Sequence, residues 1–161
     1  MVIVVVYVDD IIFGSNLNPL SKQFSTEIKK EFEMSMLGEL AFFLGLQVSQ
    51  SDKGIFISKT KCIKEMLKKF QMEDCKPMST HMITGWKLRK YDESLEVDQT
   101  MYRSMIGRLL YATKKITDNM QVVGLVARFQ SAPKETHMKA VKRIFRYLKG
   151  NLDFGLCYPK T

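Results

Sequence analysis

The stretch VVYVDDIIFGS, residues 5–15, constrains the fold more than any other part of the sequence. Two strongly apolar runs flank two adjacent aspartates, Asp9 and Asp10. A buried pair of carboxylates repels itself and loses hydration, so this pair requires either a solvated turn or a bound cation. The pattern predicts a hairpin with the aspartates at its tip, formed by residues 2–8 and 11–13. Because the first strand is continuous in valine and isoleucine, we expect it to be covered on both faces.

The next sixty residues show helical and strand patterns in turn. Asn18 followed by Pro19 predicts a helix start, with Asn18 as the capping residue, and apolar residues at every fourth position carry the helix to about Phe32. A second hairpin is predicted for residues 40–58, where LAFFLGLQVS and GIFIS flank a short polar turn.

The C-terminal part is predicted to be mainly helical. Residues 60–71 have helical spacing, and two further helices are expected at about 101–116 and 135–149. Between them, residues 74–99 contain proline, glycine and scattered charges, which predicts a loop-rich connector and a boundary between lobes. Hairpin, helix, hairpin and then helices together indicate an α+β fold.

Composition narrows the class of protein. With 45% hydrophobic and 26% charged residues, the chain is typical of a soluble globular protein, and no apolar run approaches the roughly 20 residues of a membrane span. Its three cysteines, Cys62, Cys75 and Cys157, form no CxxC pair, which favours reduced thiols in an intracellular protein over a zinc site. Cytoplasm, nucleus and organelle all remain open.

Positive charge is concentrated at the C-terminal end. The chain has a net charge of +8, and residues 101–161 carry 12 Lys and Arg against 3 Asp and Glu. This asymmetry indicates a surface that faces a polyanion. A solvated basic face is the alternative.

The aspartate pair suits metal-dependent phosphoryl transfer. Mg²⁺ or Mn²⁺ prefers hard oxygen ligands, and two such cations held by carboxylates activate the attacking oxygen and steady the leaving group. A hairpin tip would hold Asp9 and Asp10 in fixed positions. Without further context, two aspartates in a turn more often form only a solvated turn.

The two C-terminal helices carry candidate nucleic-acid-binding residues. In the first, Met101, Tyr102, Met105, Ile106, Leu109 and Ala112 share a core face, while Gly107 and Tyr111 lie opposite, with Ser104 and Lys114 nearby. A mid-helix glycine permits close approach either by a ligand or by another helix.

The second helix separates its apolar and basic residues. Val141, Ile144, Phe145 and Leu148 form its apolar face, and its other side carries Lys139, Lys142, Arg143, Arg146 and Lys149. Five cations on one face suit phosphate contacts that do not depend on sequence. Simple solvation or a membrane surface would also suit such a helix.

Several ordered motifs together resemble one family. Residues 7–10 (YVDD) resemble the YxDD box of reverse transcriptases. The motifs FFLGLQV, DCKPMST, YRSMIG, ARF and KRIFRYLKG follow in order at residues 42–48, 74–80, 102–107, 127–129 and 142–150. Together they resemble the reverse transcriptases of copia-type LTR retrotransposons, most closely those of plants.

The resemblance implies a part for each segment. Residues 1–58 would be the C-terminal palm, with Asp9 as the principal metal ligand and Asp10 as its weaker partner. Tyr7 and Val8 would lie beside the primer terminus and the incoming nucleotide. The hairpin at residues 43–58 would be the primer grip, including Leu44, Gly45 and Leu46. Residues 59–161 would be thumb and connection, and the partner would be an RNA or DNA template–primer duplex.

The sequence also departs from the family pattern. The strand that carries a third carboxylate would precede YxDD, together with the fingers, and neither is present. Residues 113–119 read TKKITDN where TxxRPDI is usual, His81 replaces a proline, and Cys157 replaces a tryptophan. We therefore expect a fragment or a decayed reading frame of a polyprotein that is inactive alone.

Two other outcomes stay open at this point. Instead of a polymerase fragment, the chain would be a non-catalytic basic nucleic-acid-binding module, or a pseudogene product without a selected role. Its protein partner would be the missing fingers and palm half, or a second copy that pairs with the exposed edge of the N-terminal strand.

Overall fold

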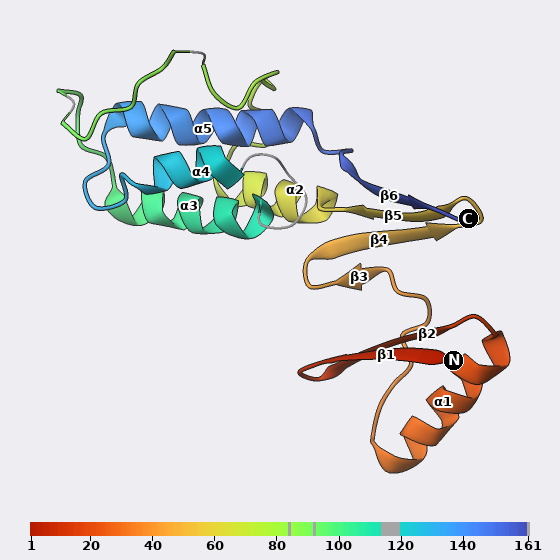
Figure 1. Cartoon of the computed structure of the whole chain (residues 1–161). Coiled ribbons are helices and arrows are strands. Elements are labelled where there is room, and N and C mark those ends of the chain that lie inside the picture. The colour runs from red at the N-terminus through yellow and green to blue at the C-terminus, as the bar shows by residue number, and fades with distance from the viewer. Residues whose placement is uncertain (84, 92, 114–119, 161) are drawn as a thin grey trace. The chain divides into compact units, whose positions relative to one another are not determined.

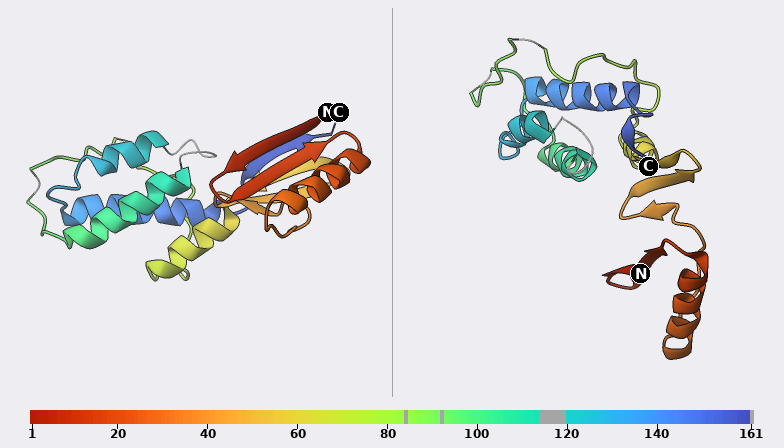
Figure 2. Two further views of the ribbon diagram at one scale, coloured as in Figure 1. Left: turned by 90° about the horizontal axis from the view of Figure 1, so that it is seen from below. Right: turned by 45° about the vertical axis from the view of Figure 1, so that its right-hand side comes forward.

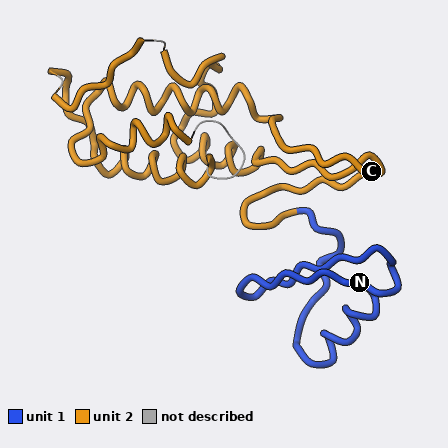
Figure 3. The backbone as a smooth tube through the Cα atoms, in the orientation of Figure 1, with its two compact units in different colours: residues 1–41 blue, residues 42–161 orange. Residues whose placement is uncertain are grey.

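The chain has a mixed α+β architecture, as the sequence predicts. The computed structural model describes residues 1–83, 85–91, 93–113 and 120–160, and these form six strands and five helices. Contacts divide the chain into two compact units, residues 1–41 (unit 1) and residues 42–161 (unit 2) (Figure 3). The second hairpin therefore belongs to the same unit as the C-terminal helices.

Unit 1 consists of the predicted hairpin and helix. Strands β1 (Val2–Tyr7) and β2 (Asp10–Ser15) pair antiparallel, and helix α1 (Asn18–Glu31) follows (Figure 1). The rings of Phe13 on β2 and Phe24 on α1 pack with centroids 5.0 Å apart. The N-cap of α1 is Leu17 and no side chain caps the helix, so the expected capping role of Asn18 is wrong.

The expectation that the first strand is covered on both faces is also wrong. Ile3 is 62% exposed and Val6 is 66% exposed. The cause is that β1 has β2 as its only strand neighbour in unit 1, and α1 contacts β2 more than β1. The apolar strand therefore keeps a free edge and open side-chain surface.

Unit 2 contains a four-stranded antiparallel sheet. Its order is β3 (Phe42–Phe43), β4 (Leu46–Ser51), β5 (Gly54–Ser58) and β6 (Gly155–Pro159). The predicted pairing of β4 with β5 is confirmed. However, the LAFFLGLQVS segment, which was expected to form one strand, is divided by a turn between β3 and β4. Strand β6 was not predicted.

Four helices complete unit 2. They are α2 (Thr60–Lys69), α3 (Gln99–Thr113), α4 (Met120–Ala127) and α5 (Glu135–Gly150). Helix α5 contacts the other three (Figure 2). The sequence predicted α2, α3 and α5 but missed α4, and the expected extension of α3 to residue 116 falls on residues outside the described ranges.

The core lies wholly between these helices. Within the described ranges, all 18 buried hydrophobic residues belong to unit 2, and the largest fully buried ones are Tyr102, Phe145, Met105, Ile106 and Leu109. The predicted apolar face of α5 is confirmed, because its four expected residues are all buried. On α3 the prediction fails for Met101, which is 39% exposed at the first turn.

The connector lies along α5 (Figure 1). It contains no helix or multi-residue strand in its described residues, as expected, and is fixed by side chains of α5. His137 is fully buried, accepts a hydrogen bond at Nδ1 from the backbone N–H of Lys134 (3.0 Å) and contacts the carbonyl of Arg89 through Nε2 (2.9 Å). Because Nδ1 is the acceptor, the proton lies on Nε2 and is donated to that carbonyl.

Candidate nucleic-acid interface

The aspartate pair lies at the tip of the first hairpin. Tyr7 pairs with Asp10 across the strands, so Val8 and Asp9 alone form the connecting turn. Both carboxylates are exposed. The solvated turn that the sequence requires is therefore present, and both side chains are accessible to a ligand.

The turn holds Val8 in a conformation that β-branched residues rarely adopt. Its φ is 50°, in the left-handed region, and its side chain is 80% exposed. Positive φ at the first position suits a two-residue hairpin turn, but there glycine is the usual residue. Strain of this kind persists mainly at functional positions.

The donor chemistry at this tip fits a divalent cation. Carboxylate oxygens are the ligands that Mg²⁺ and Mn²⁺ prefer, and Asp9 and Asp10 are adjacent and exposed. Within the described ranges, no three His, Cys, Asp or Glu residues are grouped so as to hold a metal. A cation bound here would therefore keep most of its coordination positions for water or phosphate.

A second turn, in unit 2, contains the predicted primer-grip residues. Leu44 and Gly45 connect β3 to β4, and both have positive φ, 50° and 76°. Positive φ at both central residues defines the turn that matches strand twist in a two-residue hairpin. Gly45 is required for a further reason, because a Cβ there would lie 2.5 Å from Oη of Tyr111.

The structure brings this turn together with helix α3. The hydroxyl of Tyr111 donates to the carbonyl of Leu44 at 3.3 Å. Two of the segments that the sequence singled out are thus neighbours. Gly107, by contrast, has open space where a Cβ would stand, so the alternative of a helix–helix contact at this glycine is not found in the described chain.

A buried lysine fixes the position of α3 relative to the sheet. Lys59, only 5% exposed, lies between β5 and α2 and donates to the carbonyls of Tyr111 (3.1 Å) and Ala112 (2.5 Å). A cation near the C-terminal end of a helix is favoured by the helix dipole. Lys59 therefore holds the Tyr111 end of α3 beside the β3–β4 turn.

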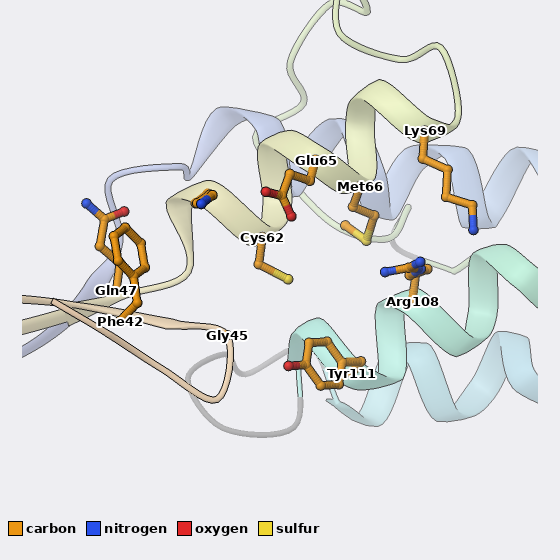
Figure 4. Close-up of a pocket in the computed structure, with 10 residues that line it drawn as sticks. Phe42, Gly45, Gln47, Cys62, Glu65, Met66, Lys69, Arg108 and Tyr111 are labelled. Carbon is orange, nitrogen blue, oxygen red and sulfur yellow. The ribbon is translucent and has the colours of Figure 1, made fainter. Parts of the chain in front are cut away.

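A cleft of about 530 Å³ opens between this turn, α2 and α3 (Figure 4). Its charged lining residues are three cations and one carboxylate: Lys61, Lys69, Arg108 and Glu65. The other lining residues are Phe42, Gly45, Gln47, Cys62, Met66 and Tyr111. The cleft is therefore cationic with aromatic walls.

Cys62 is a half-buried thiol in this cleft. Burial raises its pKa, and the nearby Glu65 carboxylate acts in the same direction, while Lys59 and Arg108 act against it. A raised pKa keeps the thiol protonated and poorly nucleophilic near neutral pH. Together with the free state of all three cysteines, this agrees with a structural thiol.

The basic face of α5 is partly used by the chain itself. Arg146 donates to the carbonyl of Lys76 at 2.7 Å, and Lys149 donates to the carbonyls of Glu73 and Cys75, the latter at 2.8 Å. Arg143 donates to Oγ1 of Thr80 at 2.8 Å. Three of the five predicted phosphate ligands thus hold the connector against α5.

The two remaining cations of α5 are more accessible. Lys139 pairs with Glu135 at 2.9 Å, with both side chains exposed. Lys142 is exposed and has no hydrogen-bond or ion-pair partner in the described part of the chain. Contact with nucleic acid by α5 stays a prediction, and Lys142 is the residue that tests it without disturbing the connector.

Sequence reasoning missed most residues of the cleft. Lys61, Glu65 and Lys69 recur at every fourth position on α2, a stripe that is also typical of a solvated helix face. Arg108 precedes Tyr111 by three residues, which places both on one face of α3. The sequence shows this spacing of charged residues. It does not show the cleft, which exists because α2 packs beside α3.

Comparison with known proteins places the chain in a family. The model of the reverse transcriptase (RNA-dependent DNA polymerase) family matches residues 1–84, just over half of the chain. The chain is 33% identical to an uncharacterized mitochondrial protein of Arabidopsis thaliana, over 96% of this chain and 64% of the relative. No solved structure matches it.

Two further relatives are much longer polyproteins. The retrovirus-related Pol polyprotein from transposon RE1 of Arabidopsis thaliana is 31% identical over 99% of this chain and 11% of its own length. The corresponding polyprotein from transposon TNT 1-94 of Nicotiana tabacum is 31% identical over 98% of this chain and 12% of its own. The chain thus spans about a tenth of these two relatives.

The chain belongs to the reverse transcriptase family. The resemblance to the copia-type members of that family is confirmed by the Pol polyproteins it matches. Within the described ranges, no helix is long and apolar enough to cross a membrane.

Proposed function

We propose that the chain is part of an RNA-directed DNA polymerase and that its two units have different roles. Unit 1 presents Asp9 and Asp10 as ligands for Mg²⁺ or Mn²⁺. Unit 2 binds the template–primer. Alone, the chain binds nucleic acid without extending a primer, because the third carboxylate and the nucleotide-binding fingers come from another polypeptide segment.

One observation carries the nucleic-acid part of this proposal. The Tyr111–Leu44 hydrogen bond brings the turn expected to be the primer grip against the helix that carries the candidate nucleic-acid-binding residues Gly107 and Tyr111. Three cations, Lys61, Lys69 and Arg108, line the space beside that contact. Cations grouped in one groove suit nucleic-acid binding that is directed at the phosphate backbone.

The metal part of the proposal rests on the hairpin tip. A bound divalent cation would activate the primer hydroxyl and neutralise charge on the phosphates. Asp9 and Asp10 would hold that cation, with Asp9 as the principal ligand. Tyr7 and Val8 would lie beside the primer end, and Val8 has the positive φ of 50° that the tight turn at this tip uses.

A binding-only module is the second candidate. It is favoured by the location of the buried core and the cationic cleft, since both lie in unit 2 and neither requires Asp9 or Asp10. The two candidates differ in one property. Only the polymerase fragment contributes carboxylates to a catalytic site that a complementary fragment completes.

A primer-extension assay separates the candidates. Purified chain would be incubated with template–primer, nucleotides and Mg²⁺, with and without a fingers and palm fragment from a copia-type polymerase. We expect no extension by either alone, extension by the mixture, and none by a mixture with Asp9→Asn. Extension that survives Asp9→Asn, or a mixture that stays inactive while binding DNA, contradicts the polymerase proposal.

Binding is measured separately by fluorescence anisotropy of a labelled template–primer at several salt concentrations. We expect micromolar or weaker affinity that falls steeply with salt, because bound phosphates release counterions. Lys142→Gln reports on α5 without disturbing the connector, whereas Arg146→Gln also removes the hydrogen bond to Lys76. Affinity that is insensitive to salt would contradict the nucleic-acid part of the proposal.

A further inference from the structure

The cleft in unit 2 is lined by cations that form no hydrogen bond or ion pair with the described residues. Lys61 and Lys69 on α2 and Arg108 on α3 have no hydrogen-bond or ion-pair partner among the described residues, and none forms an ion pair with Glu65. Three uncompensated positive charges around one cleft of about 530 Å³ attract a multiply charged anion.

The same cleft has two exposed aromatic rings. Phe42 on β3 and Tyr111 on α3 are each 54% exposed, and Figure 4 shows them to either side of Gly45. The ammonium group of Lys61 lies 4.9 Å from the ring centroid of Phe42, so charge and ring are next to each other. The aromatic surface is too exposed to be explained by the protein core.

Cations beside exposed rings favour an unpaired nucleic-acid strand over a duplex. In a duplex, each base is stacked between its neighbours, so only phosphates and groove edges are offered to a protein. In a single strand, the bases are free to stack on aromatic side chains while the phosphates contact lysine and arginine. Phe42 and Tyr111 gain nothing from a duplex.

We propose that this cleft binds a single nucleic-acid strand, with its phosphates at Lys61, Lys69 and Arg108 and an unpaired base against Phe42 or Tyr111. This inference rests on the proposed function only in taking nucleic acid as the ligand. It adds that the strand in the cleft is unpaired. The carboxylate of Glu65 opposes phosphate entry and therefore limits the affinity.

The test compares two probes on the full-length chain. A fluorescein-labelled 12-nucleotide DNA strand of mixed sequence and its blunt-ended duplex are each titrated, and anisotropy is followed at several salt concentrations. We expect the single strand to bind about tenfold or more tightly, since only its bases reach the rings. Equal affinity for the two probes would overturn the inference.

Aromatic variants with a matched control locate the binding. Phe42→Ala and Tyr111→Ala should each weaken strand binding about 5- to 100-fold without changing the salt slope. Tyr111→Phe loses the hydrogen bond to Leu44 but keeps the ring, so it should bind like the parent. Tyr158→Ala, at a ring 53% exposed on β6, is the control and should have no effect.

Charge variants independently test whether the cleft cations contact phosphates. Lys69→Gln and Arg108→Gln should each lower the slope of log affinity on log salt by about 0.7, the value for one phosphate of a single strand. Lys64→Gln, on α2 but outside the cleft, should leave the slope unchanged. Glu65→Gln should tighten binding by about 1.5- to 5-fold, because it removes an exposed opposing charge.

The possible failures are distinguishable. If the cleft variants behave like Tyr158→Ala and Lys64→Gln while both probes bind, the cleft is not the site and the inference fails. The proposed function then keeps nucleic-acid binding by the chain but loses the cleft as its location. If neither probe binds, both fail. Thermal unfolding of each variant identifies any that is unfolded, and Phe42→Leu, which keeps an apolar side chain but no ring, then replaces Phe42→Ala with the same expectation.

Discussion

The two units differ most in what holds them together. Unit 1 has 41 residues, and none of its side chains is buried. Unit 2 has a helical core of 18 buried hydrophobic residues, and buried Lys59 and His137 join its parts through hydrogen bonds. Units near 40 residues generally require a disulfide, a metal or a partner for stability. The candidate metal ligands therefore lie on the part of the chain that depends on other contacts.

This difference bears on which of the proposed functions each unit can carry by itself. A binding cleft formed by α2, α3 and the β3–β4 turn retains its shape because its walls belong to the core. The hairpin tip with Asp9 and Asp10 retains only its local turn geometry. Of the two proposed functions, we therefore expect nucleic-acid binding to depend less on other contacts than metal-dependent catalysis does.

The largest expected effect is on the core of unit 2. Phe145→Ala should lower the free energy of unfolding by about 3–5 kcal/mol, because it empties a fully buried site among the helices. Val5→Ala, at a residue 52% exposed on β1, should change it by only about 0.5 kcal/mol. Urea denaturation followed by circular dichroism measures both. Similar losses would show that unit 1 is as well packed as unit 2.

The next effect concerns the free edge of β1. This strand is six residues long, uncharged and, among the described strands, paired with β2 alone, so we expect the chain to self-associate through it. Val5→Lys should raise the dissociation constant of the associated form about tenfold or more, since a charge on an edge strand opposes pairing. Gln23→Lys adds the same charge on α1 and is the control. Sedimentation velocity that shows a monomer at high concentration would contradict this expectation.

Periodicity predicted the elements that pack against the core by one face. The buried residues of α2 and α5 follow helical spacing. Polar residues also coincide with the β4–β5 turn and with Asp9 in the β1–β2 turn. Helix α4 was missed because its sequence, MQVVGLVA, is apolar on nearly all sides and so has no clear period. Strand β6 is only five residues long and is defined by its pairing with β5, a contact distant in sequence.

The site was predictable to a similar extent. Because Asp9 and Asp10 interrupt two apolar runs, the sequence alone places them at the tip of a hairpin. In contrast, the left-handed conformation of Leu44 contradicts its intrinsic preference, so the turn that splits β3 from β4 had no local signal. The connector's use of Arg146 and Lys149 could not be predicted either, because a basic helix face looks the same whether it contacts carbonyls or solvent.

A smaller effect is expected at high pH, and it reports on unit 2 alone. The buried hydroxyl of Tyr102 donates to the carbonyl of Val126 at 2.8 Å, and burial raises its pKa. The folded pKa lies above the unfolded value of about 10, so this stabilisation is complete below pH 10 and is lost as the pH rises further. Denaturation curves between pH 8 and 11 measure it.

Two variants identify the group responsible for that loss. Tyr102→Phe should cost about 1 kcal/mol near neutral pH, through the lost hydrogen bond, and should reduce the loss above pH 10. Cys62→Ser removes the other group with a raised pKa, whose contribution begins to fall above its ordinary value of 9.0. An alkaline loss unchanged in both variants would show that neither group is its source.

The smallest effect is metal binding at the tip of unit 1. Asp9 and Asp10 are the two carboxylates at this hairpin tip, and a cation there keeps most of its water, so we expect a dissociation constant for Mg²⁺ on the order of 1 mM or weaker. Titration of the isotope-labelled chain followed by NMR should move amide signals beside these two residues and leave unit 2 unchanged. Asp9→Asn should abolish the shifts. Asp52→Asn, at an exposed aspartate in the β4–β5 turn, should not. Micromolar affinity that Asp9→Asn removes would mean that a further ligand completes the site, and unit 1 would then be less dependent on a partner than its packing indicates.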